Sequence, residues 1–340
     1  MAGAVEPEGN RTRKEVTVGV SRPRVSVYIP TYNYGRFLGE AIQSILDQTF
    51  LDWELIIVDD GSTDDTQKVV ASFADPRIHY VYQQNRGNPG ARNTALKLAR
   101  GEYVACLDAD DMWLPEMLEK LAAKLDGLPP TVGLVYGDLY LFDDEDGTTI
   151  RRFLQGRTPP RGKVLAQLLP RESAFIHDTA TLIRRKVFDT VGLYDESLLR
   201  YQDWEMWVRI AAAYEVEALD EPLARSRRHP ASNIRGMEAM YRYGRAAKTK
   251  VMASYPLSGQ ERRALRHNLA FDAYSYGMDA RRAGQRGEAW KAFFRSVRLR
   301  PGERKTYIHL GLPLLSPRLY EFLYKSYSSV KERSSPARQT

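Results

Sequence analysis

Only one cysteine, Cys106, occurs in the 340 residues, so the chain can form no internal disulfide and has no cluster of thiolate metal ligands. No apolar run approaches the ~20 residues that a helix needs to cross a bilayer. Residues 1–23 lack the apolar core of a secretory signal, and we expect them to form a polar, disordered lead. These absences predict a protein of the reducing cytoplasm, soluble or at most peripheral at the inner face of the cell membrane.

A large excess of one charge is also absent. The 50 Lys and Arg residues exceed the 43 Asp and Glu residues by only 7. This balance suits anionic ligands or an anionic membrane surface, and it is equally compatible with plain solubility. The basic residues are spread along the chain without zinc-finger spacing or an RNP-type aromatic motif, so we expect no nucleic-acid partner.

The first part of the chain alternates short apolar runs with stretches of helical periodicity. The runs predict strands at residues 25–29, 55–58, 78–82 and 103–107. The stretches between them predict helices, one of which covers residues 90–100 and is closed by Gly101 at its C′ position. This alternation predicts an α/β fold with a mostly parallel sheet flanked by helices.

The pattern changes beyond Gly133. Residues 134–142 and 149–153 flank an acidic tip and predict a hairpin. From about Met237 the chain is helical in character. Residues 273–301 are spaced like one tetratricopeptide unit, which we interpret as a helical hairpin packed on the preceding domain. The expected organisation is a lead, an α/β domain, a helical extension and a disordered tail, at residues 1–23, 24–235, 236–330 and 331–340.

Two aspartates one residue apart follow the predicted strand at residues 103–107. Ligands of open α/β sheets gather at the carboxyl ends of the strands. At such a place Asp108 and Asp110 can hold a hard divalent cation and leave positions for phosphate oxygens. With Asp111 beside them, unpaired carboxylates would repel one another, and a cation would relieve this. The alternative is an acidic cap, with Asp110 and Asp111 at the N-terminus of the next helix.

Other polar residues lie at comparable positions. Asp60 ends the second strand, where it would accept a hydrogen bond from the imide N–H of a pyrimidine base or merely form a turn. Arg92 would pair with base carbonyls or phosphate, or form a surface salt bridge of little energetic value.

Two further candidates lie beyond residue 200. Asp203 enters a helix, where it is either a partner of the helix dipole or a general base facing the cleft. His229 would supply a third metal ligand or a phosphate contact, and a histidine before a proline is also an ordinary loop residue.

Together these segments resemble glycosyltransferase family 2, a large inverting family with the GT-A fold. The resemblance runs in order and spacing over roughly residues 24 to 233. Its matching segments lie at residues 25–33, 57–64, 85–87, 91–93, 101–103, 107–111, 192–196, 202–204 and 228–230. The sequence departs from the family at Gln202, where many members carry Glu, and this bears on substrate class rather than on activity. A milder departure is Tyr194, where the family often has Phe.

The resemblance implies a role for each matching position. It makes Asp203 the catalytic base, places His229 near the diphosphate, and makes Asp110 the more direct ligand of a Mn²⁺ or Mg²⁺ ion that Asp108 also faces. The residues that it assigns to the donor nucleotide are Pro30, Thr31, Tyr32, Asn33, Asp60, Arg92 and Asp108.

The expected reaction is metal-assisted single displacement from a nucleoside-diphosphate sugar, UDP-linked first and dTDP-linked second, to a glycan or lipid-linked acceptor in polysaccharide or glycoconjugate biosynthesis. A sugar-nucleotide nucleotidyltransferase is one alternative, but the first strand is followed by Pro30, Thr31, Tyr32 and Asn33 rather than a Gly-rich basic loop. A non-catalytic nucleotide-sugar-binding module is another, and the presence of Asp110 and Asp203 argues against it.

Residues 310–327 combine leucines and aromatic residues with Arg318 and Lys325. This stretch would either rest on a membrane surface beside a lipid-linked acceptor or pack against the α/β domain.

Overall fold

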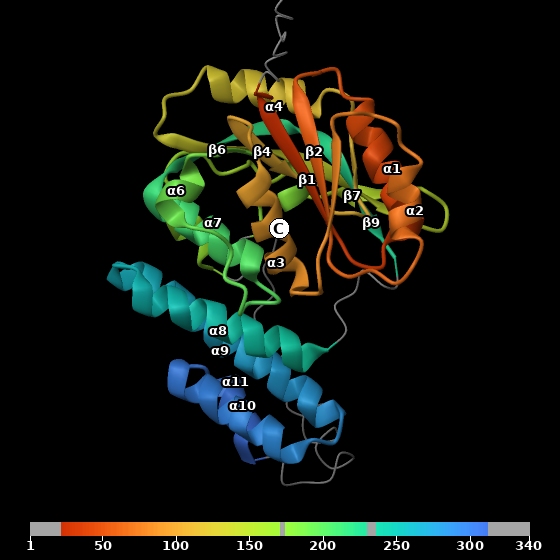
Figure 1. The fold of residues 1–340 in the computed structure, drawn as a ribbon. Helices are drawn as coiled ribbons and strands as arrows, with labels where there is room; N and C mark the ends of the chain where they lie inside the picture. Colours follow the sequence, from red (N-terminus) through yellow and green to blue (C-terminus); the bar gives the residue numbers. More distant parts are fainter. Residues whose placement is uncertain (1–21, 171–173, 230–235, 312–340) are drawn as a thin grey trace, which may run out of the picture.

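The computed structural model describes residues 22–170, 174–229 and 236–311 (Figure 1). Nearly all of the predicted lead, the predicted tail at residues 331–340, and residues 312–327 of the proposed membrane contact lie outside these ranges. Within them, no helix combines the length and the apolarity needed to span a membrane.

The α/β fold is confirmed, and the predicted strands form the first half of one sheet. Strand β1 lies between β2 and β4 and is parallel to both, and β3 adds a parallel edge next to β2. The bounds are β1 Val25–Thr31, β2 Trp53–Asp59, β3 Ile78–Tyr82 and β4 Tyr103–Cys106.

Helices cover both faces of this half, which explains why β1 and β2 are buried along their whole length. Val27 and Ile29 point to the face covered by α1 and α4, and Tyr28 points to the opposite face, covered by α3 and α7. The bounds of these helices are α1 Gly35–Leu46, α3 Gly87–Leu98, α4 Met117–Asp126 and α7 Gln202–Ala213; the short α2 is Thr66–Ala71.

The other half of the sheet is mixed in direction, which the alternating pattern did not predict. Strand β8 is antiparallel to β4 and to β6, and the long β6 and β9 run parallel to each other. Strand β5 closes the edge beside β9, and the predicted hairpin is present as β6 with β7. The bounds are β5 Met112–Trp113, β6 Val132–Asp143, β7 Thr149–Arg152, β8 Thr181–Arg184 and β9 Glu215–Arg228. Between β7 and α7 lie α5 Leu165–Leu168, the 3₁₀ turn Asp178–Ala180 and α6 Val187–Val191.

Gly101 has a different function from the predicted helix C′ residue. Helix α3 ends at Leu98, and Gly101 is not among the glycines with positive φ. A Cβ on Gly101 would lie 2.5 Å from the backbone nitrogen of Ser26, so glycine is required for the close approach of this loop to β1.

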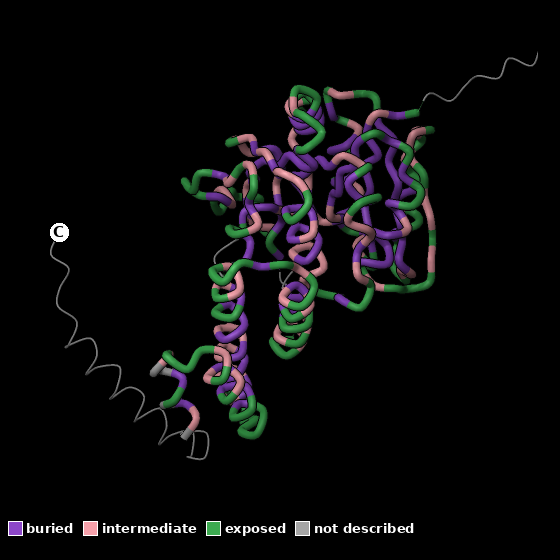
Figure 2. The backbone as a smooth tube through the Cα atoms, turned by 90° about the vertical axis from the view of Figure 1, so that its left-hand side faces the viewer, coloured by how far each residue is buried: buried purple, intermediate pink, exposed green. Residues whose placement is uncertain are grey.

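The described part of the C-terminal extension is helical, as the sequence predicts. Val251 and Leu265, on its first two helices, join the core that contains α3 and α7. The hairpin predicted at residues 273–301 is present, but its second helix packs on the first around Phe293, on the side away from the sheet (Figure 1). Buried segments are accordingly concentrated in the sheet domain (Figure 2). The helices are α8 Met237–Ser254, α9 Gly259–Arg282, α10 Arg286–Leu299 and α11 Arg304–Gly311.

Candidate active site

A cavity of about 990 Å³ opens at the carboxyl ends of β1, β2 and β4. Its wall is completed by the first turn of α7 and by side chains of α8 and α9, far away in sequence. Eight of the predicted site residues line it: Pro30, Thr31, Tyr32, Asp60, Arg92, Asp108, Asp110 and Asp203. The structure therefore brings together the polar clusters that follow separate strands in the sequence.

The acidic triplet after β4 divides between the cavity and the interior. Asp108 and Asp110 line the cavity, whereas Asp111 is buried and accepts hydrogen bonds from Thr179 Oγ1 and the Arg227 backbone nitrogen. Burial and the neighbouring Asp108 charge raise the pKa of Asp110. The helix-cap alternative is wrong, because the chain enters β5 after Asp111 and α4 begins only at Met117.

These carboxylates suit a hard divalent cation. Within the described ranges, no group of three or more His, Cys, Asp or Glu side chains is arranged to hold a metal ion. Mg²⁺-type ions are commonly bound by one or two carboxylates together with substrate phosphates and water. Asp108 and Asp110 are such a pair, and His229 as a third ligand stays a prediction.

Arg92 is a buried structural cation and not a surface residue, so the surface-salt-bridge alternative is wrong. Its guanidinium donates to Asp178 Oδ2 at 2.5 Å and to Asp108 Oδ1 at 3.0 Å, with Tyr194 beneath it. Burial raises the pKa of Asp178 to about 7, against the opposing effect of Arg92. The second oxygen of Asp178, Oδ1, has no hydrogen-bond partner among the residues that the structure describes, although the carboxylate lines the cavity.

Asp60 and Asn33 hold the loops that follow β1 and β2. Asp60 is 2% exposed, and its Oδ1 accepts from Gln83 Nε2 and from the Arg86 backbone nitrogen. Asn33 does not line the cavity. It has a φ of 56° and accepts from the Thr63 backbone nitrogen, so it links the loop after β1 to the loop after β2. A nucleoside contact for Asn33 stays a prediction.

Asp203 lies in the first turn of α7 and lines the cavity. This position is compatible with both roles considered for it, a partner of the helix dipole and a general base facing the cleft. Its Oδ1 accepts from the Trp204 backbone nitrogen at 2.7 Å. The preceding Gln202 also lines the cavity, and its buried Oε1 has no hydrogen-bond partner in the described part of the chain.

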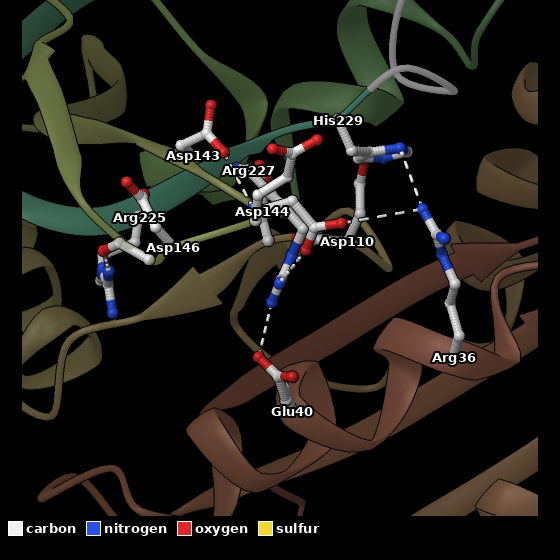
Figure 3. Close-up of polar contacts among 12 residues, drawn as sticks. Arg36, Glu40, Asp110, Asp143, Asp144, Asp146, Arg225, Arg227 and His229 are labelled. Atoms are coloured by element: carbon white, nitrogen blue, oxygen red, sulfur yellow. Dashed lines mark hydrogen bonds and ion pairs between the residues drawn. The ribbon is translucent and has the colours of Figure 1, made fainter.

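His229 lies behind Asp110 and outside the cavity lining. Its Nε2 faces Asp110 Oδ2 at 3.1 Å, and its Nδ1 faces Arg36 Nη2 at 3.4 Å (Figure 3). The ring packs on Phe37 with the centroids 4.7 Å apart. The family resemblance suggests that His229 contacts the diphosphate. In the structure, His229 instead contacts the Asp110 carboxylate and holds it in place.

Arg227, which the sequence did not single out, joins three segments behind the acidic pair (Figure 3). It donates to the backbone carbonyl of Asp110 at 2.9 Å, to Asp144 Oδ1 at 2.7 Å and to Glu40 Oε2 at 2.5 Å. Its guanidinium also contacts the rings of Phe37 and Phe142, at 4.7 Å and 4.8 Å from their centroids. Arg227 thereby ties the loop after β4 to α1 and to the β6–β7 turn.

We expect Arg227→Met to lower the free energy of unfolding by on the order of 2 kcal/mol, because the Asp110 carbonyl and the Asp144 carboxylate lose a charged donor. Urea unfolding measures this change. Arg225→Met is the matched control, since Arg225 also stacks on Phe142 but donates to the Gly147 carbonyl. Equal effects of the two substitutions would show that the Arg227 hydrogen bonds contribute little.

The sequence did not single out several residues that line the cavity: Tyr34, His177, Asp178, Arg200, Lys248, Asn268 and Asp272. His177 and Asp178 precede β8, and Lys248, Asn268 and Asp272 lie inside α8 and α9. Nothing in their spacing separates them from ordinary surface or capping residues. Only the packing of the extension brings Lys248, Asn268 and Asp272 to the cavity.

A sheet of this order with an acidic pair at its carboxyl edge is the GT-A architecture of glycosyltransferases. Solved structures share the fold. TarS 1–349 of S. aureus matches with a TM-score of 0.62 and 20% identity, covering 82% of this chain and 81% of that one. The mannosyltransferase PcManGT from Pyrobaculum calidifontis, solved with GDP-Man and Mn²⁺, matches with a TM-score of 0.55 and 22% identity, covering 89% and 84%.

Sequence comparison identifies the family. The family model "Glycosyl transferase family 2" matches residues 26–192. An uncharacterized glycosyltransferase of Methanocaldococcus jannaschii is 32% identical over 214 residues, which are 61% of this chain and 72% of that protein. The chain belongs to glycosyl transferase family 2 and is a glycosyltransferase homologue. It spans only 36% of another relative, an uncharacterized glycosyltransferase of Rickettsia conorii that is 34% identical over 220 residues, or 64% of this chain.

Proposed function

We propose that the protein transfers a sugar from a nucleoside-diphosphate sugar to an acceptor hydroxyl, with inversion at the anomeric carbon. The observation that supports this most is the common cavity of Asp108, Asp110 and Asp203. A candidate cation site and a candidate base would then lie on the walls of one space. Single displacement needs both, one on the leaving-group side and one on the acceptor side.

The proposed donor is a UDP-sugar, with a dTDP-sugar second. Asp60 lies in the cavity with its Oδ1 already engaged, and its carboxylate would accept a hydrogen bond from the N3–H that uracil and thymine share. TarS, which has the same fold, has been solved in complex with UDP-GlcNAc. Arg92 would act indirectly, by holding Asp108 in place beside the ribose.

A divalent cation, Mn²⁺ or Mg²⁺, would be held by Asp108 and Asp110 and would supply neutralisation of the charge that develops on the diphosphate. The chain's own residues orient this pair: Arg92 contacts Asp108, and His229 contacts Asp110. PcManGT, solved with Mn²⁺, is a structural neighbour and supports the same choice of ion.

The proposed base is Asp203. Its carboxylate would take the proton of the acceptor hydroxyl while that oxygen forms a bond to the anomeric carbon. The bond from the anomeric carbon to the diphosphate oxygen breaks on the opposite face, and the electron pair leaves with the nucleoside diphosphate. The products are an inverted glycoside and the free nucleotide.

We propose a glycan or lipid-linked acceptor, in polysaccharide or glycoconjugate biosynthesis at the inner face of the membrane. A nucleotidyltransferase would instead join a sugar phosphate to a nucleoside triphosphate and release pyrophosphate. Product analysis separates the two reactions, because only glycosyl transfer releases UDP.

A panel of UDP, dTDP and GDP, each with Mn²⁺, tests the donor assignment by thermal shift. We expect UDP to raise the melting temperature most, because the proposed Asp60 contact is with the N3–H of its base. A ligand at 100 times its Kd stabilises the folded state by about 2.7 kcal/mol. Omitting Mn²⁺ should reduce the UDP shift, since a cation held by Asp108 and Asp110 would neutralise the charge of the diphosphate. A larger shift with GDP than with UDP would contradict the proposed base contact.

A further inference from the structure

The start of α7 has an unusual conformation for a bulky residue. Tyr201, its N-cap, has a φ of 62°, in the left-handed region that favours glycine. Its carbonyl accepts the first helical hydrogen bond, from the Glu205 nitrogen at 2.9 Å. The conformation of Tyr201 therefore determines where the first turn begins and where Asp203, two residues later, lies.

The ring of Tyr201 is held from the C-terminal extension. Gly244 of α8 lies so close that a Cβ there would be 2.8 Å from Tyr201 Cε2 and 2.9 Å from Cζ. Lys248, one turn later on α8, places its ammonium 4.8 Å from the centroid of the same ring.

Lys248 is itself fixed by α9. It is 3% exposed, donates to Asn268 Oδ1 at 3.0 Å and forms an ion pair with Asp272. Asn268 in turn donates to the Leu169 carbonyl of the α/β domain. Burial lowers the pKa of Lys248, and Asp272 opposes this effect. The contacts form a continuous path from α9 through α8 to the ring of Tyr201.

We propose that Tyr201 is a positioning residue, through which helices α8 and α9 set the place of Asp203 in the active site. Met240, Lys248, Asn268 and Asp272 also line the cavity, so the extension is the wall beside this base. The proposal rests on the proposed function, because it takes Asp203 as the base. It gives the helices beyond residue 236 a role in turnover. These helices lie outside the family match, which covers residues 26–192.

Gly244→Ala tests the proposal, because the added methyl group must displace the Tyr201 ring. We expect kcat to fall on the order of tenfold to a hundredfold, since misplacement of a catalytic group by about 1 Å costs up to 10². The KM for the donor and the stoichiometry of nucleotide binding should stay unchanged. Gly287→Ala is the matched control, because a Cβ at Gly287 of α10 meets nothing within 4 Å.

A double-mutant cycle shows whether the effect passes through Tyr201. In a Tyr201→Ala background the ring is gone, so adding Gly244→Ala should lower kcat no further. Normalising kcat to the nucleotide bound per chain corrects for any misfolded fraction. Additive losses, a parallel loss of nucleotide binding, or a Gly244→Ala enzyme equal to Gly287→Ala would each overturn the proposal.

Asp203→Asn, measured alongside, separates this proposal from the proposed function. If Asp203→Asn keeps full activity, the assignment of the base is wrong. If it is inactive while Gly244→Ala behaves like its control, only the role of Tyr201 is wrong.

Discussion

Asp203→Asn should lower kcat by about 10²- to 10⁴-fold, the usual contribution of a general base, while nucleotide binding persists. The amide cannot accept the proton of the acceptor hydroxyl. Its oxygen can still accept the hydrogen bond from the Trp204 nitrogen that Asp203 Oδ1 accepts in the structure. The first turn of α7 is thus preserved, and the donor-side residues stay in place.

Two measurements decide this prediction: the rate of UDP release with acceptor, and UDP affinity by calorimetry. Asp189→Asn, an exposed aspartate on α6, is the matched control and should match the unaltered protein. If Asp203→Asn lost nucleotide affinity as strongly as turnover, Asp203 would have a structural role instead.

Asp110→Ala should lower turnover strongly and remove its dependence on Mn²⁺ or Mg²⁺. Removing one preorganised group that stabilises transition-state charge typically costs about 10²- to 10³-fold. The alanine also removes the partner of His229 Nε2. Asp110→Asn therefore serves as a second variant, because it keeps an oxygen for His229 but loses the charge that a cation needs.

Activity across a Mn²⁺ titration, with and without EDTA, measures the effect. Asp65→Ala, an exposed aspartate paired with Lys68, is the control and should keep the full metal response. An Asp110→Ala enzyme that stayed fully active in EDTA would show that the acidic pair does not serve a cation.

The edge of the cavity at the strand ends was predictable because it depends on local patterns. Each polar cluster directly follows an apolar run, and parallel strands deliver their carboxyl ends to one edge. Pro30, Asp60 and Asp108 accordingly reach the same cavity from three strands.

The rest of the site depends on contacts between segments that are distant in the chain. Arg92 and Asp178 are 86 residues apart and meet only because β8 packs beside β4 in the antiparallel direction. A single sequence carries no signal for this pairing. The direction of β8 was unpredictable too, because a four-residue strand shows the same apolar pattern in either direction.

Local rules also failed where they competed with tertiary packing. Asp110 and Asp111 satisfy the requirements of a helix cap, but the carboxylate of Asp111 is used by Thr179 and Arg227. Gly101 satisfies the requirements of a helix end, but its lack of a side chain allows its loop to pass close to Ser26 of β1.

The cavity has walls of separate origin: strand ends before residue 111 on one side, and α8 and α9 on the other. A hybrid enzyme could therefore keep its donor half and receive residues 237–311 from a relative, with the junction placed ahead of α8. Such a hybrid would have to keep the contacts of Gly244 and Lys248 with the Tyr201 ring, because these contacts join the two halves.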